Sequence, residues 1–173
     1  MKKYALPILL FVGLSGTFHV ATIHLTPHLV MNKLRKRTGQ VNALRYGERP
    51  TDKNRAVPMP NPDFVYTSGF YDVSERPLRV TGTVPDSSYW SFSLYQRNAA
   101  NFFVINDRQV RNRRFSFVIA KEGTPAAQLK DIPPEEILYS PTDQGFLLLR
   151  YLVDNTNYDY VRRVQQETTV RSL

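Results

Sequence analysis

The chain has 173 residues, with 23 basic and 15 acidic side chains, a formal net charge of +8 and no cysteine. Without cysteine, disulfides, thiol nucleophiles and thiolate-bound metals are excluded. The three histidines are His19, His24 and His28, so the rest of the chain has no imidazole for a Ser–His pair or a metal site. The glycines are scattered and form no phosphate-binding loop, and we expect no bound cofactor.

The net charge comes from the N-terminal part of the chain. No acidic residue precedes residue 40, whereas six basic residues do; they flank an apolar segment and are Lys2, Lys3, Lys33, Arg35, Lys36 and Arg37. Residues 40–173 hold 17 basic and 15 acidic residues, so this part is close to neutral. A nucleic-acid-binding domain carries its basic stripe on the folded part, and we therefore expect no nucleic-acid partner.

The first predicted element is a membrane helix. Residues 5–25 are uncharged, and at 1.5 Å per residue they span about 31 Å, close to the ~30 Å hydrocarbon core of a bilayer. A cleaved signal peptide has a shorter apolar region and small residues before the cut, whereas cleavage after Ala21 places His19 at a small-residue position. An uncleaved anchor is therefore favoured, with a cleaved signal peptide as the alternative. We expect residues 1–39 to contact membrane lipid as a single-span anchor with a basic flank.

Residues 40–62 predict a linker, because Gly47 and several prolines interrupt any regular element. From residue 63 the hydrophobic pattern has a period of two, which indicates half-buried strands. The predicted strands are 64–71, 78–84, 89–95, 101–105, 114–119, 137–139 and 145–153, and residues 158–166 form a short C-terminal helix. The sequence predicts that residues 40–173 form an all-β domain, an antiparallel β-sandwich that is jelly-roll-like or a partly open barrel.

Three groups of side chains offer chemistry in this domain. Aspartates at strand ends favour backbone capping, with a carboxylate pair for acid–base catalysis as the alternative: Asp63, Asp72, Asp86 and Asp107. Tyrosines share strand phases with serines and could line a ligand groove: Tyr66, Tyr89 and Tyr95 with Ser68, Ser91 and Ser93. A basic cluster indicates either a solvated loop or a patch for anionic lipid headgroups or an acidic partner: Arg108, Arg111, Arg113 and Arg114.

Four sequence blocks carry a family resemblance: Asn61-Pro62-Asp63-Phe64-Val65-Tyr66, then residues 71–80, 85–91 and 101–109. In this order they resemble the domain of unknown function 1254 family, in its short single-span bacterial form. The resemblance implies an envelope protein in the bacterial inner membrane with a periplasmic β-sandwich domain. The basic residues on the two sides of the apolar segment nearly balance and lean slightly to the alternative, a cytoplasmic domain. It also implies a separate small membrane protein that carries the domain of unknown function 1214.

The family has no established reaction, so the resemblance carries over no catalytic residue. The matching blocks mark where a ligand or partner site is expected: Asp63, Tyr66, Asp72, Tyr89, Trp90, Asn101, Asn106, Asp107 and Arg108. We favour an interaction module that docks a companion membrane protein. The alternatives are a domain that binds a small ligand or glycan, and a carboxylate-dependent hydrolase, completed by a partner, that uses Asp63 and Asp107.

Overall fold

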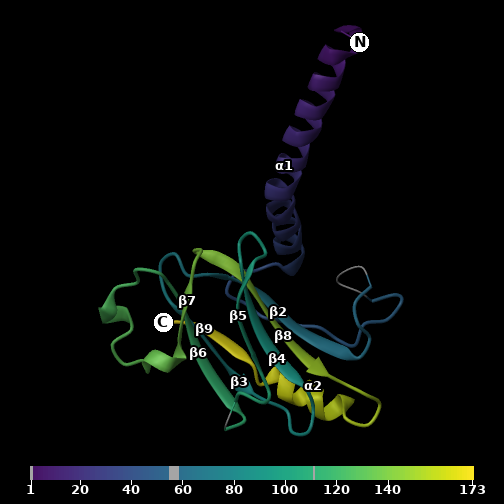
Figure 1. Cartoon of the computed structure of the whole chain (residues 1–173). Helices are drawn as coiled ribbons and strands as arrows, with labels where there is room; N and C mark the ends of the chain where they lie inside the picture. Colours follow the sequence, from purple (N-terminus) through teal and green to yellow (C-terminus); the bar gives the residue numbers. More distant parts are fainter. Residues whose placement is uncertain (1, 55–58, 111) are drawn as a thin grey trace. The chain divides into compact units, whose positions relative to one another are not determined.

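The computed structural model describes residues 2–54, 59–110 and 112–173, and the side chains of Lys2, Lys3, Arg37 and Thr38 lie outside the described part. The chain divides into two compact units, Met1–Arg37 and Thr38–Leu173 (Figure 1). Arg111, one of the four arginines of the basic cluster, also lies outside the described residues.

The first unit is a single long helix. Helix α1 (Lys2–Thr38) continues through Pro7 and Pro27, and its segment Tyr4–Lys36 is long and apolar enough to cross a membrane. The hydroxyls of Thr17 and Thr22 donate to carbonyls one turn back, so the helix itself satisfies these polar groups, as a lipid environment requires. The helix is therefore a candidate membrane span or signal anchor. The basic residues Lys33, Arg35 and Lys36 follow its apolar stretch.

The second unit contains two β-sheets. The five-stranded sheet is antiparallel and has the order β1 (Arg45–Tyr46), β2 (Phe64–Asp72), β8 (Gln144–Leu152), β4 (Trp90–Gln96), β5 (Asn101–Asn106). The four-stranded sheet has the order β7 (Ile137–Ser140), β6 (Arg114–Lys121), β3 (Leu78–Thr83), β9 (Thr169–Ser172). The short helix α2 (Tyr158–Gln166) precedes β9. The protein is thus mostly β, with a long N-terminal and a short C-terminal helix.

The predicted strands and the C-terminal helix are confirmed, whereas β1 and β9 were not predicted. The prediction of wholly antiparallel sheets is wrong at one place, because β7 runs parallel to β6. A parallel pair needs a crossover of a dozen or more residues. Residues 122–136 supply it, including the short 3-10 helices Ala126–Gln128 and Pro134–Glu136. The four-stranded sheet is therefore mixed.

The two sheets pack face to face through the side chains that alternate inward along their strands. Trp90 and Phe92 of β4 are fully buried. The ring centroid of Trp90 lies 4.9 Å from that of Phe115, and the centroid of Phe92 lies 5.8 Å from that of Phe117. Both partners belong to β6, so these ring contacts join the two sheets.

Helix α2 and the residue before β9, Thr168, close one side of this core through polar contacts. The side-chain amide of Gln165 donates to the carbonyls of Tyr66 (3.0 Å) and Gly47 (3.2 Å). The hydroxyl of Tyr151 shares a 2.9 Å hydrogen bond with the hydroxyl of Thr168, and Tyr46 donates to the Thr168 carbonyl at 2.5 Å. These bonds bring the short strand β1 and the C-terminal segment to the same place.

Candidate functional site

The outer face of the five-stranded sheet collects aromatic and aliphatic side chains in rows across its strands. One row pairs Tyr66, Arg150, Ser91 and Asn106, and the next pairs Ser68, Leu148, Ser93 and Val104. This face, called the outer face below, consists of Phe64, Tyr66, Ser68, Phe70, Ser91, Ser93, Tyr95, Val104, Asn106, Phe146, Leu148, Arg150 and Leu152. Val104 is 55% exposed and Leu152 38% exposed. These two apolar side chains are in contact with solvent, whereas Phe70, Ser91 and Ser93 are buried and the remaining side chains of the face are half-buried.

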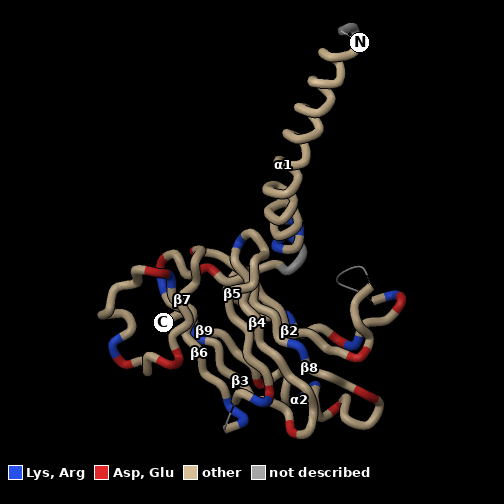
Figure 2. The backbone as a smooth tube through the Cα atoms, viewed as in Figure 1, with Lys and Arg blue, Asp and Glu red and all other residues tan. Residues whose placement is uncertain are grey.

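The outward side of the four-stranded sheet has a different composition. Its strands turn polar side chains outward, and these are Arg79, Thr81, Thr83, Arg114, Ser116, Thr169 and Arg171. Where this side becomes apolar, at Val118 and Ala120, the crossover covers it with Leu129 and Ile132. In Figure 2 the Lys, Arg, Asp and Glu residues of the second unit lie mainly in the loops. Among the described residues, the outward side of the five-stranded sheet thus carries more aromatic and aliphatic side chains than that of the four-stranded sheet.

The predicted tyrosine and serine set meets on this outer face. Tyr66 and Tyr95 lie on it together with the three serines, as their strand phases predicted. Tyr89 directly precedes β4 and lies at one end of the outer face. Its ring centroid is 6.0 Å from that of Phe64 in an edge-to-face contact. The Nε of Arg150 donates to the Ser91 hydroxyl at 3.0 Å. The face is therefore aromatic and aliphatic with one arginine near its centre.

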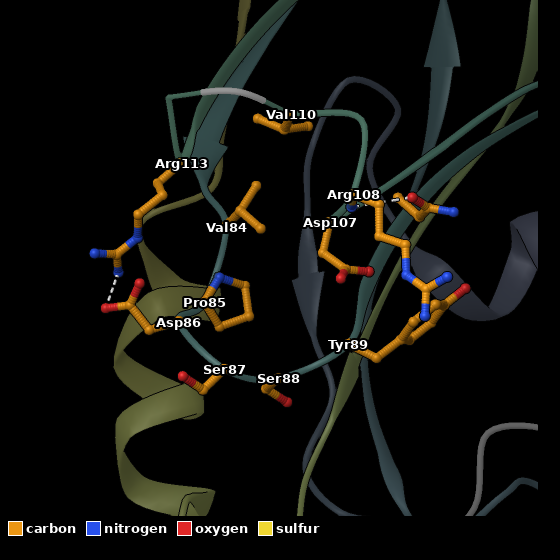
Figure 3. Close-up of a pocket in the computed structure, with 11 residues that line it drawn as sticks. Val84, Pro85, Asp86, Ser87, Ser88, Tyr89, Asp107, Arg108, Val110 and Arg113 are labelled. Carbon is orange, nitrogen blue, oxygen red and sulfur yellow. Dashed lines mark hydrogen bonds and ion pairs between the residues drawn. The ribbon is translucent and has the colours of Figure 1, made fainter.

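A pocket of about 630 Å³ lies between the β3–β4 loop and the β5–β6 loop (Figure 3). It is lined by Val84, Pro85, Asp86, Ser87, Ser88, Tyr89, Asn106, Asp107, Arg108, Val110 and Arg113. Two of these residues, Ser87 (φ 56°) and Arg113 (φ 54°), have left-handed backbone conformations that are unfavourable for non-glycine residues. Strained backbone of this kind is concentrated at binding sites in folded proteins.

One wall of the pocket is held by an ion pair. The guanidinium of Arg113 binds the carboxylate of Asp86, as Figure 3 shows. The hydroxyl of Tyr160 on α2 accepts hydrogen bonds from the Asp86 backbone N–H (2.9 Å) and from Arg113 Nη2 (3.3 Å). The opposing charges of Asp86 and Arg113 therefore neutralise each other. No pattern in the sequence pointed to Tyr160, because its role depends on where α2 packs.

The opposite wall contains Asp107 and Arg108. The backbone N–H of Asp107 donates to the Trp90 carbonyl (3.1 Å), which fixes the turn after β5 against the start of β4. Oδ1 of Asp107 is buried without a hydrogen-bond partner in the described part of the chain. Figure 3 shows the Asp107 carboxylate pointing into the pocket and the Arg108 side chain extending toward Tyr89. The wall thus offers an acceptor and a donor to a bound molecule.

The comparisons with known proteins identify the family. The family model described as "Protein of unknown function (DUF1254)" matches residues 41–172. The chain belongs to this family. No curated protein matches the chain.

Two crystal structures resemble this DUF1254 chain. The VPA0106 protein from Vibrio parahaemolyticus has a TM-score of 0.68 at 13% identity, with 88% of this chain and 35% of that chain covered. A putative uncharacterized protein from Burkholderia cenocepacia has a TM-score of 0.52 at 14% identity, with 90% of this chain and 42% of that chain covered. At these identities the likeness shows the fold alone. This chain spans less than half the length of either protein.

Within the DUF1254 domain, four of the nine sequence-predicted site residues line the pocket: Tyr89, Asn106, Asp107 and Arg108. Tyr66 lies on the outer face. Trp90 is fully buried in the core and lines neither surface. Its phase with Phe92 and Leu94 in the sequence already indicated this inward direction.

Asp72 and Asn101 hold the ends of their own strands. Oδ1 of Asp72 accepts hydrogen bonds from the backbone and hydroxyl of Ser74, and Oδ2 accepts from the Gln144 amide at 2.6 Å. The Asn101 amide donates to the carbonyls of Leu94 and Phe103 at a register shift between β4 and β5. Asp72 thus fits the capping interpretation, and Asn101 likewise makes local structural contacts.

Asp63 and Asp107 occur at one end of the five-stranded sheet, but on different strands. Asp63 precedes β2 and Asp107 follows β5, with β8 and β4 between them. Three strand spacings of ~4.8 Å place their backbones about 14 Å apart. Asp63 is also 63% exposed and pairs with Arg49 at 3.8 Å. This arrangement offers little support for a carboxylate pair, whose oxygens act at separations of about 5–9.5 Å.

Proposed function

We propose that this protein is a membrane-tethered docking module whose outer face binds a companion membrane protein. The observation that carries the proposal is the contrast between the two sheets. One turns arginines and threonines outward, whereas the other turns out aromatic and aliphatic side chains, including Val104 and Leu152. Antiparallel sheets that face water are polar on that side, and an exposed apolar face marks an interaction surface.

The two similar crystal structures support a protein as the occupant. The shared region makes up 35% of one chain and 42% of the other, so in both proteins it is joined to a larger amount of further polypeptide. We propose that a separate membrane protein, which carries the domain of unknown function 1214, binds the outer face of this chain. An apolar sheet face of this kind suits a protein surface of matching shape.

The proposed location is the bacterial inner membrane. In this arrangement α1 is a single span, the basic residues Lys33, Arg35 and Lys36 lie at the periplasmic lipid headgroups, and the β domain lies in the periplasm. A C-terminal alkaline phosphatase fusion, which becomes active only outside the cytoplasm, tests the orientation. We expect an active fusion; an inactive, stably expressed fusion contradicts the periplasmic placement.

The docking proposal is tested by purifying the tagged full-length protein from its native membranes in mild detergent. We expect a small membrane protein at equal stoichiometry, identified by mass spectrometry. The double variant Val104→Glu/Leu152→Glu introduces charges on the outer face at exposed positions, which leaves the core intact. We expect it to retain less than about a tenth of the partner, a loss of roughly 1.4 kcal/mol in binding free energy.

The matched control is Tyr139→Glu, because Tyr139 is 50% exposed on β7 of the other sheet. We expect this variant to retain the partner as the wild type does. A wild-type protein that elutes alone, or a double variant that keeps its partner, contradicts the docking proposal.

A further inference from the structure

The carboxylate of Asp107 differs from the other aspartates at strand ends. Asp72 and Asp154 each accept hydrogen bonds from the backbone and hydroxyl of the residue two positions later. Asp107 has no such contact: Oδ1 is buried, and no donor reaches it within residues 59–110 or the other described ranges. The Asp107 carboxylate points into the pocket (Figure 3) and is paired with no described cation, so its charge is left for a bound molecule to neutralise.

The neighbouring residue has the complementary property. Arg108 is exposed, and its guanidinium forms no ion pair or hydrogen bond with any described side chain. Across the pocket, by contrast, Asp86 and Arg113 bind each other. One wall of the pocket therefore holds the ion pair Asp86–Arg113. The other wall holds Asp107 and Arg108, whose charges are not paired with any described side chain.

We propose that this pocket binds a small zwitterion, with an ammonium group on Asp107 and a carboxylate or phosphate on Arg108. The four charged side chains of the lining cancel, so a ligand with a large net charge gains no overall attraction. An ammonium group makes the strongest hydrogen bond to a carboxylate, and an anion does so to a guanidinium. Val84, Pro85 and Val110 provide the apolar part of the lining.

The dimensions of the pocket agree with such a ligand. Its volume of about 630 Å³ lies within the ~300–1,000 Å³ typical of small-molecule sites. The ring of Tyr89 lies at its edge and is 37% exposed, so it can contact an ammonium group through its face. The required chemistry is shared by free amino acids or short peptides and by phosphoethanolamine headgroups, and the experiment separates these sources.

The test is isothermal titration calorimetry on the full-length protein in nanodiscs. The probes are alanyl-alanine, its N-acetylated form, its C-terminal amide, phosphoethanolamine and maltose. We expect alanyl-alanine, phosphoethanolamine or both to bind. If alanyl-alanine binds, we expect its N-acetylated form and its C-terminal amide each to bind at least about tenfold more weakly. Preference for alanyl-alanine assigns the site to amino acids or peptides, and preference for phosphoethanolamine assigns it to headgroups.

Variants connect the binding to the named side chains. We expect Asp107→Asn, which keeps the shape and removes the charge, to weaken the bound zwitterion at least about tenfold. We expect Arg108→Gln to weaken it similarly. The control Asp131→Asn removes an exposed carboxylate outside the pocket and leaves binding unchanged. The proposal is overturned by the absence of zwitterion binding, by preferential binding of maltose, or by wild-type affinity in Asp107→Asn.

Discussion

The hydroxyl of Tyr71 occupies the space in which a side chain at position 145 would begin. A Cβ on Gly145 would lie 2.2 Å from the Tyr71 hydroxyl oxygen and 2.2 Å from the carbonyl oxygen of Tyr95. Tyr71 and Gly145 are direct partners in the register of β2 and β8. Glycine at this position therefore allows the large side chain of Tyr71 to pack in the core, against the inner face of the five-stranded sheet.

We expect Gly145→Ala to destabilise the β domain by about 3 kcal/mol, because one of the atoms it meets is backbone and cannot rotate away. Thermal unfolding of the full-length protein, followed by far-ultraviolet circular dichroism, measures the effect. The control is Gly13→Ala in α1, where nothing lies within 4 Å of the added Cβ. A melting temperature for Gly145→Ala equal to that of the control would show that the sheet relaxes around the methyl group.

The same tyrosine and Tyr151 predict how stability depends on alkaline pH. Burial raises the pKa of each hydroxyl from 10.0 to about 12. Between these values the unfolded chain releases protons that the folded protein retains. The stabilisation that each buried hydroxyl provides is therefore fully present below pH ~10 and is lost by pH ~12. Between these values the free energy of unfolding falls by about 1.4 kcal/mol per pH unit for each tyrosine.

Urea unfolding at several pH values between about 9 and 12 measures this slope. We expect Tyr71→Phe and Tyr151→Phe each to reduce the slope of the unfolding free energy against pH by about 1.4 kcal/mol per pH unit, the value for one proton. Tyr139→Phe is the control, because that side chain is half exposed. A slope that is identical in all four proteins rules out the two buried hydroxyls as its source.

The sequence was sufficient to predict strands whose side chains alternate regularly. Phe92 and Leu94 on β4, for example, show both the strand and its inward side. The missed strands β1 and β9 are short, and their positions depend on distant contacts such as that between Tyr46 and Thr168. The period of two also carries no information about strand direction, so the parallel pairing of β7 could not be predicted.

The candidate sites were predictable only in part, for a related reason. Strand phase alone placed Tyr66 and Ser91 on one face. The pocket, however, depends on two separate loops and on Tyr160 of α2, which accepts hydrogen bonds from Asp86 and Arg113 on one wall. A position next to a strand end gave Asp72 and Asp107 the same expected role, and only their contacts distinguish them.

This difference leads to opposite expectations for the two aspartates. Asp72→Ala removes the acceptor used by Ser74 and by Gln144, so we expect a loss of about 1–2 kcal/mol in the free energy of unfolding. Asp107→Ala removes a buried oxygen without a donor, so we expect unchanged stability or a gain of up to about 1 kcal/mol.

Urea unfolding and calorimetric titration of the same two variants separate stability from binding. We expect Asp72→Ala to unfold more easily and to bind the zwitterionic probe as the wild type does. We expect Asp107→Ala to be at least as stable and to lose the probe. Binding residues are commonly retained at a cost to stability. If Asp107→Ala instead destabilises the domain as much as Asp72→Ala, its carboxylate holds the turn after β5, and the argument for a ligand at this position fails.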